Sequence, residues 1–326
     1  MEPNEKIPRS VLPTTLTRKV FQRMDPMKII EAAKLSEDFA DLVKRSGPLD
    51  HELAIDFRSG KILMRCRGIL YEMFVQETIG DKIRVIKTDE FGPLRVYLHV
   101  DNSGDAWMDL GLWISNLFNC PIMCFHTGPR RLSAEKFQQH IDRIIRRQPV
   151  IEELSLYFDR YPADELQHIL GNIRVNHDLF INITQVPQIE FEFLYSPRII
   201  RIIHSAWFTM QNLQEINNAY LIKLENSHLT NGDLDVVMRQ WTQGGYENLQ
   251  YLEVTGSGLD LNTPILGITP PFEGSGYKML FSLYQYSFVM VNGVEIRSVN
   301  GKDGLMKLEQ TADGITFKMM NITESD

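Results

Sequence analysis

The sequence has little cysteine and no long apolar run. Its three cysteines are Cys66, Cys120 and Cys124 in a chain of 326 residues. A small, odd number of cysteines predicts reduced thiols rather than a disulfide framework. No apolar run reaches the roughly 18 residues that span a bilayer, and the polar first ten residues contain no signal-peptide core. We therefore expect an intracellular protein of the cytoplasm or nucleus.

The chain also lacks an excess of positive charge. It has 34 Lys and Arg residues against 42 Asp and Glu, which gives a formal net charge of -8. Nucleic acids bind basic surfaces, and so do anionic membranes, so neither is an expected partner. The hydrophobic fraction of 43% is ordinary for a globular protein. A chain of this length can bury a large core.

The motifs that carry much of known enzyme chemistry are absent. The sequence contains no phosphate-binding loop, dinucleotide fingerprint, zinc-protease motif or nucleophile elbow. Cys120, Cys124 and His126 come closest to a metal site. Strand geometry directs Cys124 into the core, and no fourth ligand is evident for a structural zinc ion. We therefore expect no enzymatic activity, no cofactor and no metal.

Helix signals fill the first part of the chain. Apolar residues recur at helical spacing from Leu16 onward. Asp25-Pro26 can start a second helix, Ser36 can cap a third, and Gly47-Pro48 can end it. The pattern predicts three short helices over 12–46. Their apolar residues exceed what so small a bundle can bury, so part of this set should contact the rest of the chain or a partner.

These helices resemble an F-box in its nematode form. The similarity lies in Leu12-Pro13, Val20-Phe21, Met24-Asp25-Pro26-Met27, Leu35-Ser36 and Leu42-Val43-Lys44. The resemblance implies that 9–47 form a module that binds an Skp-type adaptor and, through it, a cullin complex. The adaptor contacts of the family map onto Leu12, Pro13, Leu16, Val20, Phe21, Met24, Met27 and Ile30. An ordinary core face of three capped helices would give the same pattern.

A strand-like pattern recurs along the rest of the chain. It consists of two apolar residues separated by one residue, with a small polar residue three positions later. Clear copies start at Leu154, Leu179, Ile200, Ile222 and Leu252, and weaker copies start at Val96 and Ile122. The copies follow one another at intervals of roughly 20–30 residues, close to the period of leucine-rich repeats.

Helical patterns lie between several of these strands: at 105–118, from Ser133 to Ile145, at 163–173, and from Thr230 to Gly244. Such alternation predicts parallel strands with right-handed crossovers. Short strands at 53–57, 69–76 and 83–87 should form a capping sheet. Strands at 281–291, 294–299, 306–310 and 315–319 should form an antiparallel sheet. Asn292-Gly293 should make the hairpin turn between the first two of these, and 312–314 should turn the last pair.

The predicted fold is therefore α/β. An N-terminal three-helix F-box is followed by a body over 48–326. That body is an irregular, leucine-rich-repeat-like curved parallel sheet with outer helices and a C-terminal antiparallel sheet.

The body resembles the type-2 F-box-associated domain of nematodes. The similarity lies in Leu229-Thr230-Asn231-Gly232-Asp233-Leu234, Arg239, Trp241, Asn248-Leu249, Tyr251-Leu252, Val294-Glu295-Ile296-Arg297, Asp303-Gly304 and Phe317-Lys318-Met319. One departure is Asp235, where the family usually has Asn. Before about residue 195 only the pattern agrees, so the resemblance transfers no target contacts to that region.

Residues between the apolar strand positions should face the concave side of the curved sheet. Aromatic, arginine and charged residues gather there, which is typical of a protein-binding surface. The predicted target-binding residues are Phe125, Tyr157, Phe180, Arg201, Lys223 and Glu253. The alternative is that a terminal segment or the first domain covers these side chains.

The sequence thus predicts a non-catalytic substrate receptor of a cullin–RING (SCF-type) ubiquitin ligase. Its helices would bind the adaptor, and its body would bind a protein target. The alternative is a protein-binding scaffold that does not engage the adaptor.

Overall fold

The computed structural model describes residues 13–76, 84–87, 93–99, 106–128, 134–185, 192–272, 274, 278–283 and 286–322. The chain forms two compact units, Met1–Phe125 and His126–Asp326. Helices and strands share the described residues, so the fold is α/β, as predicted. Every helix among these residues is too short or too polar to cross a membrane.

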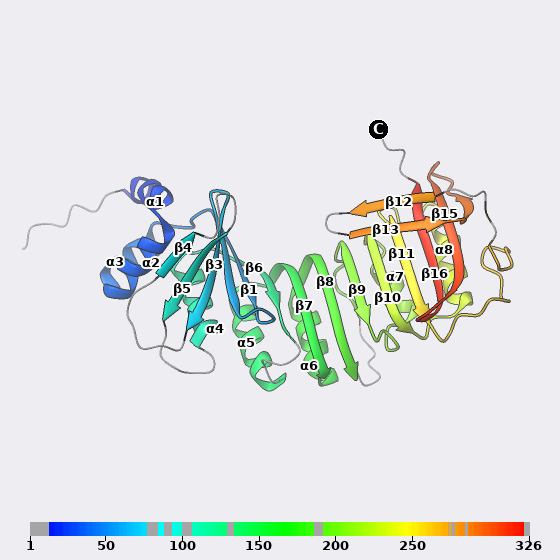
Figure 1. Ribbon diagram of the computed structural model, residues 1–326, viewed down its shortest axis with the longest axis horizontal. Helices are drawn as coiled ribbons and strands as arrows, with labels where there is room; N and C mark the ends of the chain where they lie inside the picture. Colours follow the sequence, from blue (N-terminus) through cyan, green and yellow to red (C-terminus); the bar gives the residue numbers. More distant parts are fainter. Residues whose placement is uncertain are drawn as a thin grey trace, which may run out of the picture. The chain divides into compact units, whose positions relative to one another are not determined.

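Three short helices begin the described part of the first unit (Figure 1): α1 Thr14–Arg23, α2 Pro26–Leu35 and α3 Glu37–Arg45. Both predicted caps are present. The carboxylate of Asp25 accepts a hydrogen bond of 2.8 Å from the backbone of Met27, and the hydroxyl of Ser36 accepts one of 3.2 Å from the backbone of Phe39. The rings of Phe21 and Phe39 meet edge to face, with centroids 5.7 Å apart.

A small sheet follows these helices. Its strands are β1 His51–Asp56, β2 Lys61–Cys66, β3 Ile69–Gln76, β4 Arg84–Lys87 and β5 Leu94–His99, and α4 Ala106–Phe118 and β6 Ile122–His126 come next. Strands β1, β2 and β3 pair antiparallel, while β5 runs parallel to β3 and antiparallel to β4. The short strands predicted at 53–57, 69–76 and 83–87 are therefore present in one sheet, and β2 is an addition. The predicted repeat copy at Val96 is wrong, because β5 belongs to this sheet and pairs with β3 and β4.

The N-terminal helices are docked on the rest of their unit. Helix α3 contacts α4. The guanidinium of Arg67, in the β2–β3 turn, donates hydrogen bonds of 3.1 and 3.2 Å to the carbonyls of Arg23 and Met24 at the end of α1. The apolar residues that three helices cannot bury alone are thus partly covered within the unit. A separate role for the helical module stays a prediction.

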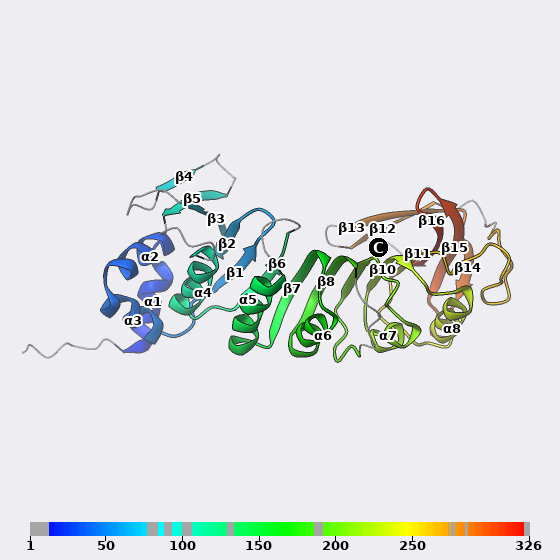
Figure 2. The same ribbon diagram turned by 90° about the horizontal axis from the view of Figure 1, so that it is seen from below.

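The second unit is built on five parallel strands. Its elements are α5 Ala134–Arg147, β7 Val150–Arg160, α6 Ala163–Asn172, β8 Arg174–Gln185, β9 Ile199–Ile203, α7 Met210–Glu215, β10 Leu221–Ser227, α8 Asn231–Thr242 and β11 Tyr251–Gly256. Strands β7 to β11 pair in chain order, each parallel to the next. The helices lie on one face of this sheet (Figure 2). The predicted parallel sheet with outer helices is therefore confirmed, and the short α7 is an addition.

The repeating pattern has a physical basis in this sheet. Its apolar positions, such as Leu154, Ile181 and Leu224, are fully buried. Two of its small polar positions, Ser205 and Ser227, are also fully buried. The backbone N–H and the hydroxyl of Ser205 donate to the carbonyl of Glu225 at 2.8 and 2.9 Å. The pattern therefore sets both the helix-facing core and the hydrogen bonds that close the strand ends.

The C-terminal strands divide between two sheets. They are β12 Lys278–Leu283, β13 Tyr286–Val291, β14 Val294–Arg297, β15 Asp303–Thr311 and β16 Gly314–Ile322. Strand β16 pairs antiparallel with β11, and β15 and β14 follow it, so these three strands extend the main sheet. Strands β12 and β13 form a separate hairpin on the face opposite the helices (Figure 2). The predicted turn at 312–314 is confirmed by the pairing of Thr311 with Gly314.

The predicted hairpin at Asn292-Gly293 is wrong. Strand β13 pairs with β12, while β14 pairs with β15. Asn292 does adopt a left-handed backbone, with φ 59°, but this turn leads the chain from the hairpin into the main sheet. Residues 281–291 contain no Gly, Pro, Asn or Asp. None of the strongest turn-forming residues therefore marks the end of β12.

Candidate functional site

Four of the predicted target-binding residues stand in one row across the second unit. Phe180, Arg201, Lys223 and Glu253 lie opposite one another on β8, β9, β10 and β11. The row continues through Lys318 and Lys307 on β16 and β15. The ring of Tyr157, on β7, lies 4.8 Å from that of Phe180. The structure therefore brings the predicted residues of this unit together.

Phe125 lies apart from this row. It belongs to the first unit, its side chain is fully buried, and its ring meets Phe57 edge to face at 5.4 Å. A core ring of this kind offers no surface to a target. The structure therefore gives no support to a target contact at Phe125.

The β12–β13 hairpin covers the neighbouring row on the same face. Ile199, Leu221 and Tyr251 lie two residues before Arg201, Lys223 and Glu253, so both rows face the same side. The ring of Phe288, on β13, stacks on Tyr251 at 4.0 Å. The hairpin and the sheet together bury a cluster of Ile199, Leu221, Tyr251, Met290, Leu305 and Met320. A terminal segment thus covers part of the predicted surface.

Arg201 stands at the boundary of the covered area. Its guanidinium lies over the ring of Phe180 at 4.6 Å and over the ring of Tyr286 at 4.5 Å. The negative faces of both rings attract the cation. Arg201 Nη2 also pairs with Asp178 Oδ2 at 3.3 Å. The charge of Arg201 is therefore largely satisfied within the chain.

The other charges of the row are also paired internally. Lys223 Nζ lies 3.2 Å from a carboxylate oxygen of Glu225 and of Glu253. Burial alone would lower the pKa of Lys223, but the two carboxylates outweigh it and raise that pKa above its usual value. Lys307 and Lys318 share Glu309. A target gains little from charges that already have partners, so the row is in large part structural.

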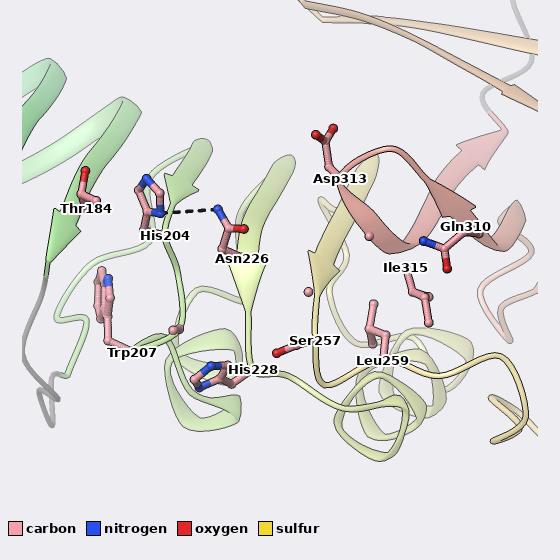
Figure 3. Close-up of a pocket in the computed structure, with 13 residues that line it drawn as sticks. Thr184, His204, Trp207, Asn226, His228, Ser257, Leu259, Gln310, Asp313 and Ile315 are labelled. Atoms are coloured by element: carbon pink, nitrogen blue, oxygen red, sulfur yellow. Dashed lines mark hydrogen bonds between the residues drawn. The ribbon is translucent and has the colours of Figure 1, made fainter.

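A cavity of about 590 Å³ lies at the carboxyl ends of the same strands (Figure 3). Thr184, His204, Asn226 and Gly256 line it from the ends of β8, β9, β10 and β11, and Asp313 lines it from the β15–β16 turn. We call it the strand-end trough. The carboxyl ends of parallel strands are a frequent place for ligand sites in α/β proteins. The trough is therefore the strongest candidate for a binding site in this unit.

The backbone at the trough has an uncommon conformation. His204 and Asn226, which occupy corresponding places at the ends of β9 and β10, have φ 61° and φ 53°. Left-handed residues other than glycine often occur at functional sites. The two side chains point the same way in Figure 3, and His204 Nδ1 lies 3.4 Å from Asn226 Nδ2.

Trp207 contributes an unpaired donor to the trough. Its side chain is only 5% exposed, and its Nε1 is buried without a hydrogen-bond partner among the described residues. Figure 3 shows its ring extending toward the side on which Thr184 and His204 lie. Buried polar groups are almost always hydrogen bonded, so this donor indicates a place for an external acceptor. Trp207 is not among the target-binding residues predicted from the sequence.

The predicted adaptor-binding residues fall into two groups in the first unit. Phe21, Met27 and Ile30 are buried, and Met24 is half-buried. Pro13, Leu16 and Val20 are exposed, Leu16 by 49% and Val20 by 51%. Leu12 lies outside the described residues. The buried residues can hold the helices together, while the exposed residues are the ones that an adaptor could contact directly.

Two further apolar residues of the helices are exposed. Leu35, at the end of α2, is 87% exposed, and Leu42, on α3, is 44% exposed. Leu16 and Val20 lie one turn apart on α1. These four apolar side chains are therefore accessible to a partner.

The segment from β9 to β11 carries two capped helices. Thr209 and Asn212 form a capping box on α7, and Thr230 and Asp233 form one on α8. Residues 188–254 match the family model described as F-box associated. This F-box-associated segment includes the trough residues from His204 to His228. No match was found among curated proteins, and none was found among solved structures.

Asp235, where the resembled family usually has Asn, has a clear role in the F-box-associated segment. Its Oδ1 accepts a hydrogen bond of 2.7 Å from the backbone of Leu266, and its Oδ2 accepts one of 2.6 Å from Arg239 Nε. Burial would raise the pKa of Asp235, but these two bonds outweigh it and lower the pKa. An asparagine could accept from Leu266 but would lose the ion pair.

Proposed function

We propose that the chain is a substrate-recognition subunit of a cullin–RING (SCF-type) ubiquitin ligase in the cytoplasm or nucleus. Helices α1 to α3 bind an Skp-type adaptor, and the second unit binds a protein target. The observation that carries this proposal is the F-box associated match at 188–254, in a chain whose described part begins with three short helices.

The chain supplies proximity and performs no bond chemistry. Holding a target beside the catalytic partners of the ligase raises its effective concentration there. The charged groups on the open face of the second unit favour this non-catalytic role, since Arg201, Lys223 and Glu253 are engaged in internal pairs.

The exposed residues of α1 support the adaptor contact. Leu16 and Val20 have half of their side-chain surface in water. Burying such surface against a partner is favourable by about 25 cal/mol for each Å². The buried Phe21, Met27 and Ile30 hold the helices in place, so substitutions there would disturb the fold rather than the contact alone.

The test is co-elution of the full-length chain with a purified Skp-type adaptor on size exclusion. The wild type should co-elute, and the Leu16→Asp/Val20→Asp double variant should bind at least about tenfold more weakly. Val299→Asp is the matched control, because Val299 is 76% exposed and lies in the second unit. Circular dichroism of each variant should show an intact fold.

Point substitutions suit this test better than a truncation, because removing the three helices would uncover α4. A wild-type chain that does not bind the adaptor would overturn the ligase proposal and leave a protein-binding scaffold as the function. Equal binding by the wild type and the double variant would remove α1 from the contact.

A further inference from the structure

We propose that the strand-end trough binds an extended, basic segment of the target protein, with a lysine or arginine side chain at Asp313 and a main-chain carbonyl at Trp207. This inference deepens the proposed function and rests on it, because the trough would be the place where the receptor holds its target.

The shape of the trough fits an extended chain. It crosses the ends of β8, β9, β10, β11 and β16, which follow one another in the sheet. Neighbouring strands lie about 4.8 Å apart, so the trough is about 20 Å long. An extended peptide rises about 3.3 Å per residue and would cross it in roughly six residues. A compact small molecule would leave much of this length empty.

The charge of the trough selects a basic segment. If histidines are counted as neutral, Asp313 is the one charged residue that lines the trough. No Lys or Arg lines it. The Asp313 carboxylate makes no ion pair with any described residue and is exposed. Phosphorylated and acidic segments require cationic partners that this lining lacks. The net charge of -8 adds a long-range attraction for a cationic segment.

The polar groups at the other end select a peptide backbone. Trp207 Nε1 is a buried donor without an acceptor, and a peptide carbonyl supplies one. Leu259 and Ile315 line the Asp313 side of the trough (Figure 3), and their apolar side chains offer a surface on which the aliphatic part of a lysine or arginine can lie. Asn226 and Gln310 add amide groups that can pair with the backbone on either side.

A metal ion is the main rival occupant, because two histidines and an aspartate line the trough. Among the described residues, however, His204, His228 and Asp313 do not bring their ligand atoms close enough together to hold one ion. A peptide can contact each of these side chains separately along the trough, so it does not require their ligand atoms to lie close together.

The test is selection of a random peptide library, with peptides of roughly nine residues, on the immobilised full-length chain without adaptor. Selected peptides should be enriched in Lys and Arg. The affinity of the synthetic peptides should fall about two- to fivefold in Asp313→Asn and about two- to tenfold in Trp207→Phe. Asp159→Asn is the matched control, since Asp159 is an exposed carboxylate on β7 that does not line the trough.

A second readout reports on the trough directly. The chain has 4 tryptophans, and Trp207→Phe identifies the indole N–H signal of Trp207 by its loss from the nuclear magnetic resonance spectrum. Selected peptides should shift this signal and leave that of the buried Trp241 in place. If Trp207→Phe does not fold, Asp313→Asn still decides the question, because Asp313 is exposed.

Failure of the selection to enrich any peptide would overturn the proposal. Enrichment of peptides without basic residues, or of peptides that bind Asp313→Asn and wild type equally, would also overturn it. Adaptor co-elution is measured separately and depends on α1. A failed peptide selection would therefore not decide whether the chain binds the adaptor.

Discussion

The hydroxyl of Tyr286 donates a hydrogen bond of 2.6 Å to Asp178 Oδ2, across 108 residues of sequence. This bond joins the β12–β13 hairpin to β8 of the main sheet. The same carboxylate oxygen accepts from Arg201 Nη2 at 3.3 Å. Asp178 is only 7% exposed, and its Oδ1 has no hydrogen-bond partner among the described residues. The hairpin therefore helps to satisfy a buried charge.

Tyr286→Phe should lower the free energy of unfolding of the second unit by about 1–3 kcal/mol, because it removes a donor from a buried carboxylate. Urea unfolding measures this loss, and amide hydrogen exchange should become faster in β13. Val289→Thr is the matched control, since Val289 lies on the exposed face of the same strand. Equal stability of Tyr286→Phe and the wild type would show that the bond contributes nothing.

A second prediction compares two glycines. A Cβ atom at Gly256, at the end of β11, would lie 2.0 Å from the backbone oxygen of Ser227, whereas one at Gly171, in α6, would meet nothing within 4 Å. Gly256→Ala should therefore cost about 1–3 kcal/mol or more of stability. Gly171→Ala should gain about 0.5–1 kcal/mol, because alanine is the better helix former.

Thermal unfolding of both alanine variants measures this contrast. Similar melting temperatures for Gly256→Ala and the wild type would show that β10 and β11 can separate at no cost at this point. A loss of stability in Gly171→Ala would show that α6 has a close neighbour near its end.

The third prediction concerns the cap of α8 in the F-box-associated segment. The Thr230 hydroxyl accepts a hydrogen bond of 3.2 Å from the Asp233 backbone, and the Asp233 carboxylate accepts one of 2.8 Å from the Thr230 backbone. Thr230→Ala should lower the free energy of unfolding by about 1 kcal/mol, within the usual range for a lost cap. Thr230→Ser keeps the hydroxyl, so urea unfolding should show that this variant retains most of the free energy of unfolding that Thr230→Ala loses. If both variants lose the same amount, the methyl group rather than the cap is responsible.

These examples show which parts of the fold the sequence could predict. The caps at Asp25, Ser36 and Thr230 depend on residues three or fewer positions away, so they can be read locally. The five parallel strands follow from a pattern that repeats within each strand and fixes which side chains face the helices. Local signals therefore predicted the helices and the parallel strands well.

Features that depend on distant partners could not be predicted in the same way. The pairing of β5 with β3, the break between β12 and β13, and the bond from Tyr286 to Asp178 all depend on segments far apart in the chain. The strand pattern put Phe180, Arg201, Lys223 and Glu253 on one face of the sheet, as the strand pairing has them, but the internal ion pairs of the charged residues were not visible in the sequence. The strand-end trough was missed because its residues lie at the ends of strands and in the segments that follow them, where periodic patterns end.

The last prediction concerns the pH dependence of the first unit. His51 is only 6% exposed, and its ring meets Phe118 edge to face at 4.8 Å. Burial lowers the pKa of His51 below its ordinary value of 6.5, and Arg67 adds to this effect while Asp50 opposes it. Below pH 6.5, His51 therefore binds a proton in the unfolded chain but not in the folded chain. Stability should fall as the pH decreases.

Urea unfolding at a series of pH values between about 7 and about 5 should show this loss, with a slope of at most about 1.4 kcal/mol for each pH unit from this residue. His51→Phe keeps an aromatic ring against Phe118 and removes the titrating group, so it should flatten the slope. Leu53→Met is the matched control, because Leu53 is also buried in β1 and carries no titrating group, so this variant should leave the slope unchanged. A slope in His51→Phe equal to that of the wild type would place the titrating group elsewhere in the chain.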